Sequence, residues 1–132
     1  MKIFIGQAVT GENLDILKEE CFKIQNIISE SGNESYCTIN PKKELNEKTA
    51  KEWLIHAFEE IDKRDTFLAI IRSEKRSEGL LIEIGYALSK KKRLIVVIKK
   101  DIRDKTYIDE LADYVIEFEN IEELNKKLKD IK

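Results

Sequence analysis

Short apolar runs alternate with longer segments of helical periodicity along the chain, and this alternation limits the fold more than any other feature. Mostly apolar runs predict strands at 3–5, 36–39, 67–71, 94–98 and 114–118. Apolar residues spaced by three and four predict helices within 14–28, 50–61, 77–88, 108–112 and 121–131. With 132 residues, this pattern is typical of a single α/β domain over 1–132, with a parallel sheet covered by helices on both faces.

The predicted strands differ in how completely they are apolar. Segments 67–71 and 94–98 are apolar throughout, as in central parallel strands, whereas 114–118 alternates and 36–39 is short and mixed, as at sheet edges. We therefore expect a flavodoxin-like, doubly wound five-stranded parallel sheet of order 2-1-3-4-5. Ligands of such sheets bind beyond the carboxyl ends of the strands where the winding reverses, so the loops after Ile5 and Ile71 are the expected site.

Composition narrows the classes of partner. The chain has 24 Lys+Arg and 26 Asp+Glu, a net charge of −2, so it lacks the basic excess that favours a nucleic acid polymer or an anionic membrane. It has no apolar run of about 18 residues and begins MKIFIG without a signal peptide, so we expect a cytoplasmic protein. Cys21, Cys37 and the single His56 fit neither a disulfide framework nor a zinc site, and no metal or cofactor is expected.

The segment SEGLLIEIGYAL, residues 77–88, places a carboxylate within an apolar helix. Apolar residues surround one turn, so we expect this helix to lie buried against the sheet. A bare buried carboxylate would cost on the order of several kcal/mol. Glu83 therefore either reaches solvent or a lysine, or it lies at the wall of a ligand cavity, which makes it a candidate catalytic residue.

Further candidates for substrate binding lie in the loop after the first strand and at the start of the Glu83 helix. The loop GQAVTG contributes Gly6, Gln7, Thr10 and Gly11, whose segment suits an anion or a sugar near backbone N–H groups. It matches neither GxGxxG nor a Walker loop, so a plain βα turn is the alternative.

At the helix start, Ser77 is either an N-cap or a ligand contact. Gly79 and Gly85, which flank Glu83, each cost about 1 kcal/mol in a helix relative to Ala, a cost that a close ligand approach would explain.

Three features together, IFIG at 3–6, Asp65 before an apolar strand, and SEGLLIEIGYALSKKKRLIVVI, resemble the nucleoside 2-deoxyribosyltransferase family, which includes the 2′-deoxynucleoside 5′-phosphate N-hydrolases. The resemblance covers most of the chain in layout and is most specific around E-I-G-Y-A. In that family the Glu of an E-x-G-x-A motif attacks C1′ of the deoxyribose and releases the base. The resemblance therefore implies an enzyme with Glu83 as nucleophile, which passes the sugar to water or to another base.

The position six residues before the nucleophile bears on the substrate. The transferase branch carries an aspartate there and the phosphate-recognising hydrolase branch a serine, so Ser77 favours a nucleoside 5′-monophosphate. The chain departs from the family in two places. The second acidic residue falls at Ala57, and Val9 stands where the hydrolase loop usually has an Arg.

Substitutes for the missing groups are open. His56, Glu59 or Glu60 could replace the acid if the helix register is shifted, and the lysines at 99 and 100 are one alternative source of positive charge. The resemblance also implies a homodimer or larger homo-oligomer. The alternatives are a catalytically silent nucleotide-binding or signalling module on the same fold and a glycohydrolase for a dinucleotide such as NAD.

Overall fold

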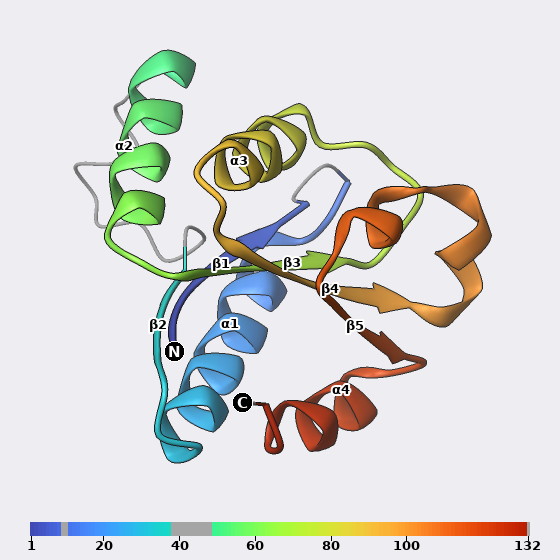
Figure 1. Cartoon of the computed structure of the whole chain (residues 1–132). Helices are drawn as coiled ribbons and strands as arrows, with labels where there is room; N and C mark the ends of the chain where they lie inside the picture. The colour runs from blue at the N-terminus through green and yellow to red at the C-terminus, as the bar shows by residue number, and fades with distance from the viewer. Residues whose placement is uncertain (9–10, 38–48, 132) are drawn as a thin grey trace.

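The structure, a computed structural model, describes residues 1–8, 11–37 and 49–131. Within them, five parallel strands form one sheet in the order β2-β1-β3-β4-β5 (Figure 1). The predicted order is therefore confirmed, and Ile39, at the end of the predicted second strand, lies outside the described residues. The strands are β1 (Lys2–Gln7), β2 (Glu34–Cys37), β3 (Thr66–Ile71), β4 (Arg93–Lys99) and β5 (Tyr114–Phe118).

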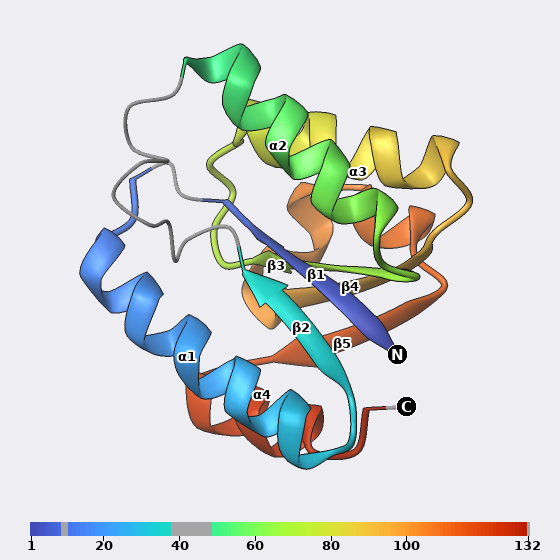
Figure 2. The same ribbon diagram turned by 90° about the vertical axis from the view of Figure 1, so that its left-hand side faces the viewer.

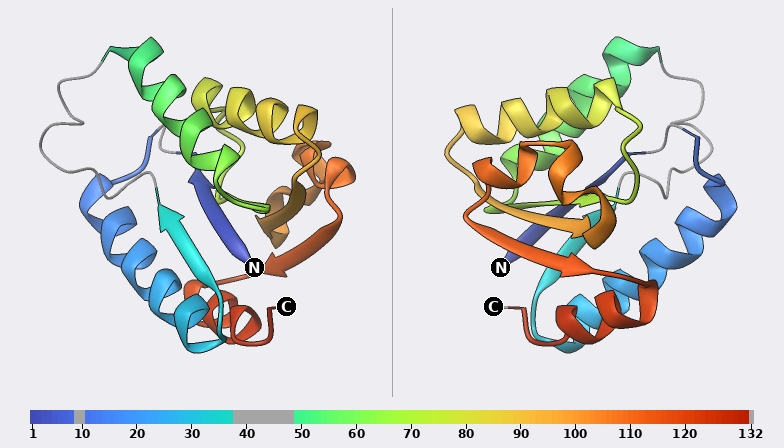
Figure 3. Two further views of the ribbon diagram at one scale, coloured as in Figure 1. Left: turned by 60° about the vertical axis from the view of Figure 1, so that its left-hand side comes forward. Right: turned by 90° about the vertical axis from the view of Figure 1, so that its right-hand side faces the viewer.

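Helices cover both faces of the sheet, as predicted. The helices α1 (Leu14–Glu30) and α4 (Ile121–Leu128) lie on one face, and α2 (Ala50–Asp62) and α3 (Glu78–Ser89) lie on the other (Figures 2 and 3). The core has two matching halves, because successive strand residues point to opposite faces. Ile3 and Ile5 pack toward α1, whereas Phe4 packs toward α2 and α3.

The helix starts follow ordinary capping chemistry. Asn13 accepts hydrogen bonds from the backbone N–H groups of Asp15 and Ile16 at the start of α1. Thr49 and Glu52 form a capping box at the start of α2. Asn120 caps α4 by accepting from the backbone N–H of Glu123. These contacts satisfy amide groups that would otherwise lack intrahelical partners, so the helix starts are set locally by sequence.

The connection from β4 to β5 differs from the prediction of a helix over 108–112. Two 3₁₀ segments occupy it, η2 (Lys100–Lys105) and η3 (Ile108–Leu111). No residue of η3 is fully buried, although Ile108 and Ala112 pack partly buried against the core half beneath α2 and α3. The backbone is already extended at Ala112, before β5 begins. A stretch this short, with only a few apolar contacts, gains too little packing to offset the cost of nucleating an α-helix.

The two cysteines also differ from the prediction. Cys21 of α1 and Cys37 at the end of β2 form a disulfide, although the sequence spacing indicated no such framework. Both side chains are buried in the core half beneath α1, and the fold brings their Cα atoms to 6.8 Å. Spacing alone could not reveal this pair because the contact is made through the sheet's topology. Among the helices of the described residues, none has the length and apolar character needed to cross a membrane.

Candidate active site

Ser77 forms the start of α3 at the carboxyl edge of the sheet. Its Oγ accepts a hydrogen bond from Leu80 N at 3.4 Å, which satisfies one of the amide groups that a helix start leaves unpaired. Ser77 is therefore a helix cap. Its hydroxyl proton is still available for donation to a ligand, because a hydroxyl group both accepts and donates.

One side of α3 packs against the sheet. Leu80, Ile84 and Ala87 are buried, whereas Leu81 and Ile82 are 40% and 45% exposed. The helix therefore lies against the sheet as predicted, but part of its apolar surface remains exposed. The sheet and the neighbouring α2 cover only part of its circumference (Figure 3).

Glu83 lies on the flank of α3 that meets α2. Tyr86, three residues further along, shares this flank, and its ring stacks on Phe58 of α2 with centroids 4.1 Å apart. Leu81, two residues before Glu83, projects about 200° away around the helix. The Glu83 carboxyl group is thus directed toward the α2 side of the helix and away from its outer surface.

Burial raises the pKa of the Glu83 carboxyl group from 4.5 to about 7, because removal from water disfavours the charged form. Within the described part of the chain, Glu83 has no hydrogen-bonding or ion-pair partner. A half-buried carboxyl group with no protein partner is available to a ligand. Groups of this kind cluster at functional sites, since their protonation changes near neutral pH.

Gly6 is positioned by packing at the end of β1. A Cβ at this position would lie 2.5 Å from Cζ of Phe67 and 3.0 Å from Cδ1 of Leu80. Contacts this short do not occur for real side chains, so the position requires glycine. Gly6 thereby lets β1, β3 and α3 meet close to the candidate site.

Gln7 faces the opposite side of the sheet from Glu83. Its side chain is buried, and its Nε2 donates to Cys37 Sγ at 3.6 Å. Its Oε1 is buried without a hydrogen-bonding partner. Because residues along a strand alternate between faces, Gln7 lies on the α1 side with Ile5, whereas α3 covers the other side. The structure therefore does not bring Gln7 and Glu83 together.

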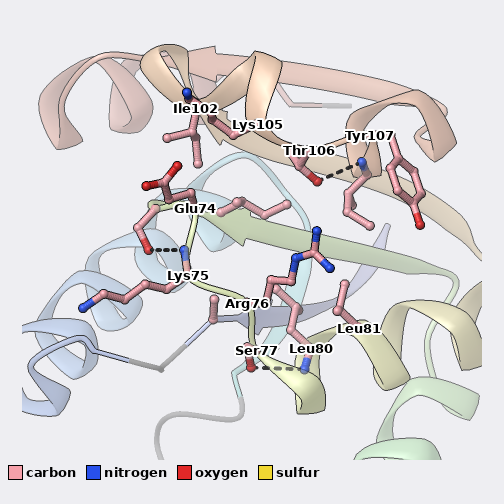
Figure 4. Close-up of a pocket in the computed structure, with 14 residues that line it drawn as sticks. Glu74, Lys75, Arg76, Ser77, Leu80, Leu81, Ile102, Lys105, Thr106 and Tyr107 are labelled. Carbon is pink, nitrogen blue, oxygen red and sulfur yellow. Dashed lines mark hydrogen bonds between the residues drawn. The ribbon is translucent and has the colours of Figure 1, made fainter.

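A cavity of about 120 Å³ opens at the carboxyl ends of β3 and β4. It lies between the start of α3 and the segment that carries Ile102 to Ile108 (Figure 4). Of the predicted site residues, Ser77 lines it, and Glu83 does not. Its apolar part includes Ala8, Ile71, Leu80 and Ile102, and its polar rim includes Lys75, Arg76 and Lys105.

The sequence reasoning missed these cationic residues and Tyr107. A signal for two of them exists, because Lys75 and Arg76 directly precede Ser77 in the loop after β3. That loop ends at the switch point where such sheets bind ligands. The sequence gives no sign that Lys105 and Tyr107 lie near this site, since their approach to α3 depends on the path of the β4–β5 connection.

Gly79 and Glu83 share one flank of α3, one turn apart. No described atom lies within 4 Å of a Cβ built at Gly79, or of one built at Gly85. Packing within the described residues therefore requires neither glycine. Along the helix axis, the six residues from Ser77 to Glu83 correspond to about 9 Å.

Gly11 adopts a φ of +77°, a conformation that favours glycine. A Cβ there would lie 2.6 Å from Nζ of Lys75, so the Lys75 side chain lies directly against the loop after β1. Thr10 and Val9 fall outside the described residues.

The substitutes considered for the family's second acid lie away from Glu83. Ala57 is buried in the core. His56 projects about 200° away from Phe58, the residue that contacts α3, and its Nε2 lies 2.7 Å from Tyr36 Oη.

Glu60 is occupied by ion pairs. Burial opposes its ionisation, but hydrogen bonds from Arg64 and Lys63 outweigh burial and lower the pKa of its carboxyl group. Glu59 is exposed. The lysines considered for positive charge also have acidic partners, since Lys99 lies 4.0 Å from Asp101 and Lys100 lies 3.3 Å from Glu119. In the residues that the structure describes, no three His, Cys, Asp or Glu side chains gather as they would around a metal ion.

No protein-family model matches the chain, and no curated protein matches it in sequence. Solved structures share its fold. The CMP N-glycosidase BcmB of Clostridium botulinum superposes with a TM-score of 0.70 at 19% identity, over 97% of this chain and 98% of that one. The 2-deoxyribosyltransferase of Bacillus psychrosaccharolyticus gives 0.67 at 17% identity, over 100% and 93%. That of Leishmania mexicana gives 0.60 at 16%, over 85% and 74%.

These neighbours have the flavodoxin-like α/β architecture that the sequence predicts. The resemblance to the nucleoside 2-deoxyribosyltransferase family, first drawn from the E-I-G-Y-A segment, is thus matched by the fold of an N-glycosidase and of two deoxyribosyltransferases.

Proposed function

We propose that the protein cleaves the N-glycosidic bond of a nucleoside or of its 5′-monophosphate, with Glu83 as the nucleophile. The observation that carries the proposal is the unpaired Glu83 carboxyl group on the α2 flank of α3, whose pKa burial raises to about 7. The fold shared with an N-glycosidase and with deoxyribosyltransferases supports it.

The chemistry accounts for a carboxylate at this position. Breaking the bond between C1′ and the base develops positive charge on the sugar, which a nearby carboxylate stabilises. A Glu83 oxygen then bonds to C1′ while the base leaves with the bonding electron pair and takes up a proton. Water or a second base attacks C1′ in the next step, which releases the carboxylate.

The buried Ala57 cannot protonate the leaving base. His56 lies beside Tyr36, and Glu60 is paired with Arg64. The leaving base can instead take its proton from solvent or from another group around the bound substrate, and the reaction still balances. Ser77 and the segment of Gly6, Thr10 and Gly11 remain the proposed substrate-binding residues, and Gly79 leaves room next to Glu83. Gln7 is not proposed to bind substrate, and its role is to support the end of β1.

The test is a panel of nucleosides and 5′-monophosphates, in deoxy and ribo forms, incubated with and without an acceptor base. We expect released base from the wild type and a loss of at least about 10³-fold in Glu83→Ala. Glu78→Ala removes an exposed carboxylate from the same helix and is the matched control. Base release that persists in Glu83→Ala would contradict the assignment of Glu83 as the nucleophile.

The acceptor separates the two reactions. Release that requires an added base identifies a transferase, and release into water from monophosphates identifies a hydrolase. Ser77→Asp tests phosphate recognition, since like charge should weaken binding of a monophosphate more than of its nucleoside.

A catalytically silent nucleotide-binding module is the second candidate. The burial of Ala57 at the position of the family's second acid favours it. This candidate predicts saturable nucleotide binding by calorimetry without any bond cleavage, and turnover would exclude it.

We also propose a homodimer or larger homo-oligomer. The exposed apolar side chains of α3, Leu81, Ile82 and Leu88, are a surface that a second copy would cover. Light scattering of the wild type and of Ile82→Glu tests this, and a monomer in both would contradict it.

A further inference from the structure

The cations beside the candidate cavity lack protein counterions, which sets them apart in a chain rich in acids. Lys75, Arg76 and Lys105 form no ion pair with any described residue. Elsewhere, arginines next to the core are paired, as Arg72 is with Glu20 at 2.8 Å and Arg103 with Asp109 at 3.1 Å. These three exposed cations therefore have no ion-pair partner among the described residues, although Glu74 lines the same cavity and Glu78 lies in the first turn of α3.

Lys75 differs from the other two cations in its position. Its side chain runs from the loop after β3 to the loop after β1, where its Nζ occupies the space that a side chain at Gly11 would need. Figure 4 shows Lys75 directed away from Lys105 and Tyr107, toward this neighbouring loop. These two loops flank the switch point of the sheet. The ammonium group of this exposed lysine thus lies at the edge of the sheet where ligands of this fold bind.

Other donors face the same edge of the sheet. The hydroxyl of Ser77 can donate, because its hydrogen bond to Leu80 N uses only a lone pair. The N-terminus of α3 adds the positive end of the helix dipole. A neutral sugar hydroxyl would leave the Lys75 charge uncompensated, whereas a phosphate group would pair with it through charge-assisted hydrogen bonds.

The separation from Glu83 fits a single ligand. Ser77 and Glu83 are about 9 Å apart along α3, so a phosphate at the helix start and a sugar carbon beside Glu83 lie in different parts of one site. The loop position Val9, where the related hydrolases usually carry an arginine, provides no charge of its own.

We propose that Lys75 binds the 5′-phosphate of the substrate and makes the enzyme select a nucleoside monophosphate over the free nucleoside. The proposal rests on the proposed N-glycosidic function and assigns the cation to the loop after β3. Lys75 is a specificity residue in this assignment, since it contacts the phosphate and not the bond that breaks.

The test compares a 5′-monophosphate with its nucleoside in the wild type, Lys75→Met and Lys75→Arg. For Lys75→Met we expect kcat/KM to fall by about 10- to 100-fold on the monophosphate, mainly through KM. We expect kcat/KM for the nucleoside to stay within about twofold of the wild-type value, because a nucleoside has no phosphate for Lys75 to bind. Lys75→Arg should keep most of the preference.

Lys23→Met is the charge-matched control, because Lys23 is an exposed residue of α1 on the opposite face of the sheet. It should leave both substrates unaffected. Equal losses on monophosphate and nucleoside in Lys75→Met, or no loss on either, would overturn the proposal.

Calorimetry with a 5′-monophosphate and with its nucleoside separates this proposal from the proposed function. If no substrate is cleaved but monophosphate binding is lost in Lys75→Met and kept in Lys23→Met, the N-glycosidic function fails and the phosphate assignment stands. If cleavage occurs and monophosphate affinity is unchanged in Lys75→Met, the assignment fails and the function stands.

Discussion

The main chain of Gly6 lies against the ring of Phe67, so that a Cβ at Gly6 would stand 2.5 Å from Phe67 Cζ. The same Cβ would lie 3.0 Å from Cδ1 of Leu80 in α3. We expect Gly6→Ala to lower the free energy of unfolding by about 1–3 kcal/mol, because the added methyl group must displace a ring or a helix. Urea denaturation measures the change.

Gly79→Ala is the matched control for this substitution. No described atom approaches a Cβ at Gly79, and Ala is favoured over Gly in a helix by up to about 1 kcal/mol. We expect Gly79→Ala to be as stable as the wild type or more so. Equal stability of Gly6→Ala and the wild type would show that the Phe67 contact relaxes easily.

The stacked rings of Phe58 and Tyr86 join α2 to α3, and the Tyr86 hydroxyl donates to the Asp62 carboxylate. We expect Phe58→Ala to lower the free energy of unfolding by about 2 kcal/mol, since it removes a half-buried ring and its stacking contact with Tyr86. Phe22→Ala is the control, because Phe22 is 50% exposed on α1, and it should change stability by less than about 0.5 kcal/mol. Similar losses in both would contradict a specific role for the stack.

The sheet could be predicted because the burial of each strand determines the apolar pattern of its own residues. Residues 67–71 and 94–98 are apolar at every position since β3 and β4 are covered on both faces, and the alternation in 114–118 marks β5 as an edge. The helix prediction for 108–112 was wrong because the few apolar residues there fit either an α-helix or a 3₁₀ segment. Only packing against β4 decides between them.

The candidate site was predicted less completely. The position of Glu83 in an apolar helix indicated its unusual environment, and burial does raise its pKa. The orientation of Gln7 toward α1 follows from strand alternation, but the exact end of β1 was needed to apply it. The disulfide of Cys21 with Cys37 joins a helix to a strand, and the approach of Lys75 to Gly11 joins two loops. Both depend on tertiary contacts, which periodicity does not encode.

Reduction of the Cys21–Cys37 disulfide should destabilise the protein. The bond closes a loop between residues 16 positions apart, and the chain-entropy model gives about 3 kcal/mol for a loop of this length. We expect the free energy of unfolding to fall by about that amount in dithiothreitol. The chain has only these two cysteines, so the Cys21→Ser/Cys37→Ser variant should not respond to the reductant. An equal response in both proteins would contradict the bond.

The pH dependence of activity tests the role of Glu83. A nucleophile must be ionised, and burial raises the pKa of this carboxyl group to about 7. We therefore expect kcat/KM to rise about tenfold per pH unit below pH 7 and to level off above it. A profile that is flat between pH 5 and pH 8 would show that ionisation of Glu83 does not control the reaction.

The same pKa makes a prediction about stability that does not depend on activity. Because the folded pKa lies near 7 and the ordinary value is 4.5, the native state holds a proton that the unfolded chain has released between these values. The stabilisation from Glu83 is therefore complete below about pH 4.5 and is lost as pH rises through 7. Glu83→Gln keeps a neutral side chain at every pH, so its stability advantage should grow over this range to about 3 kcal/mol. Urea denaturation of both proteins at pH 4 and pH 8 measures the difference, with Glu78→Gln as the control for losing one negative charge. A gap that stays constant with pH would show that the Glu83 carboxyl group is not held away from water.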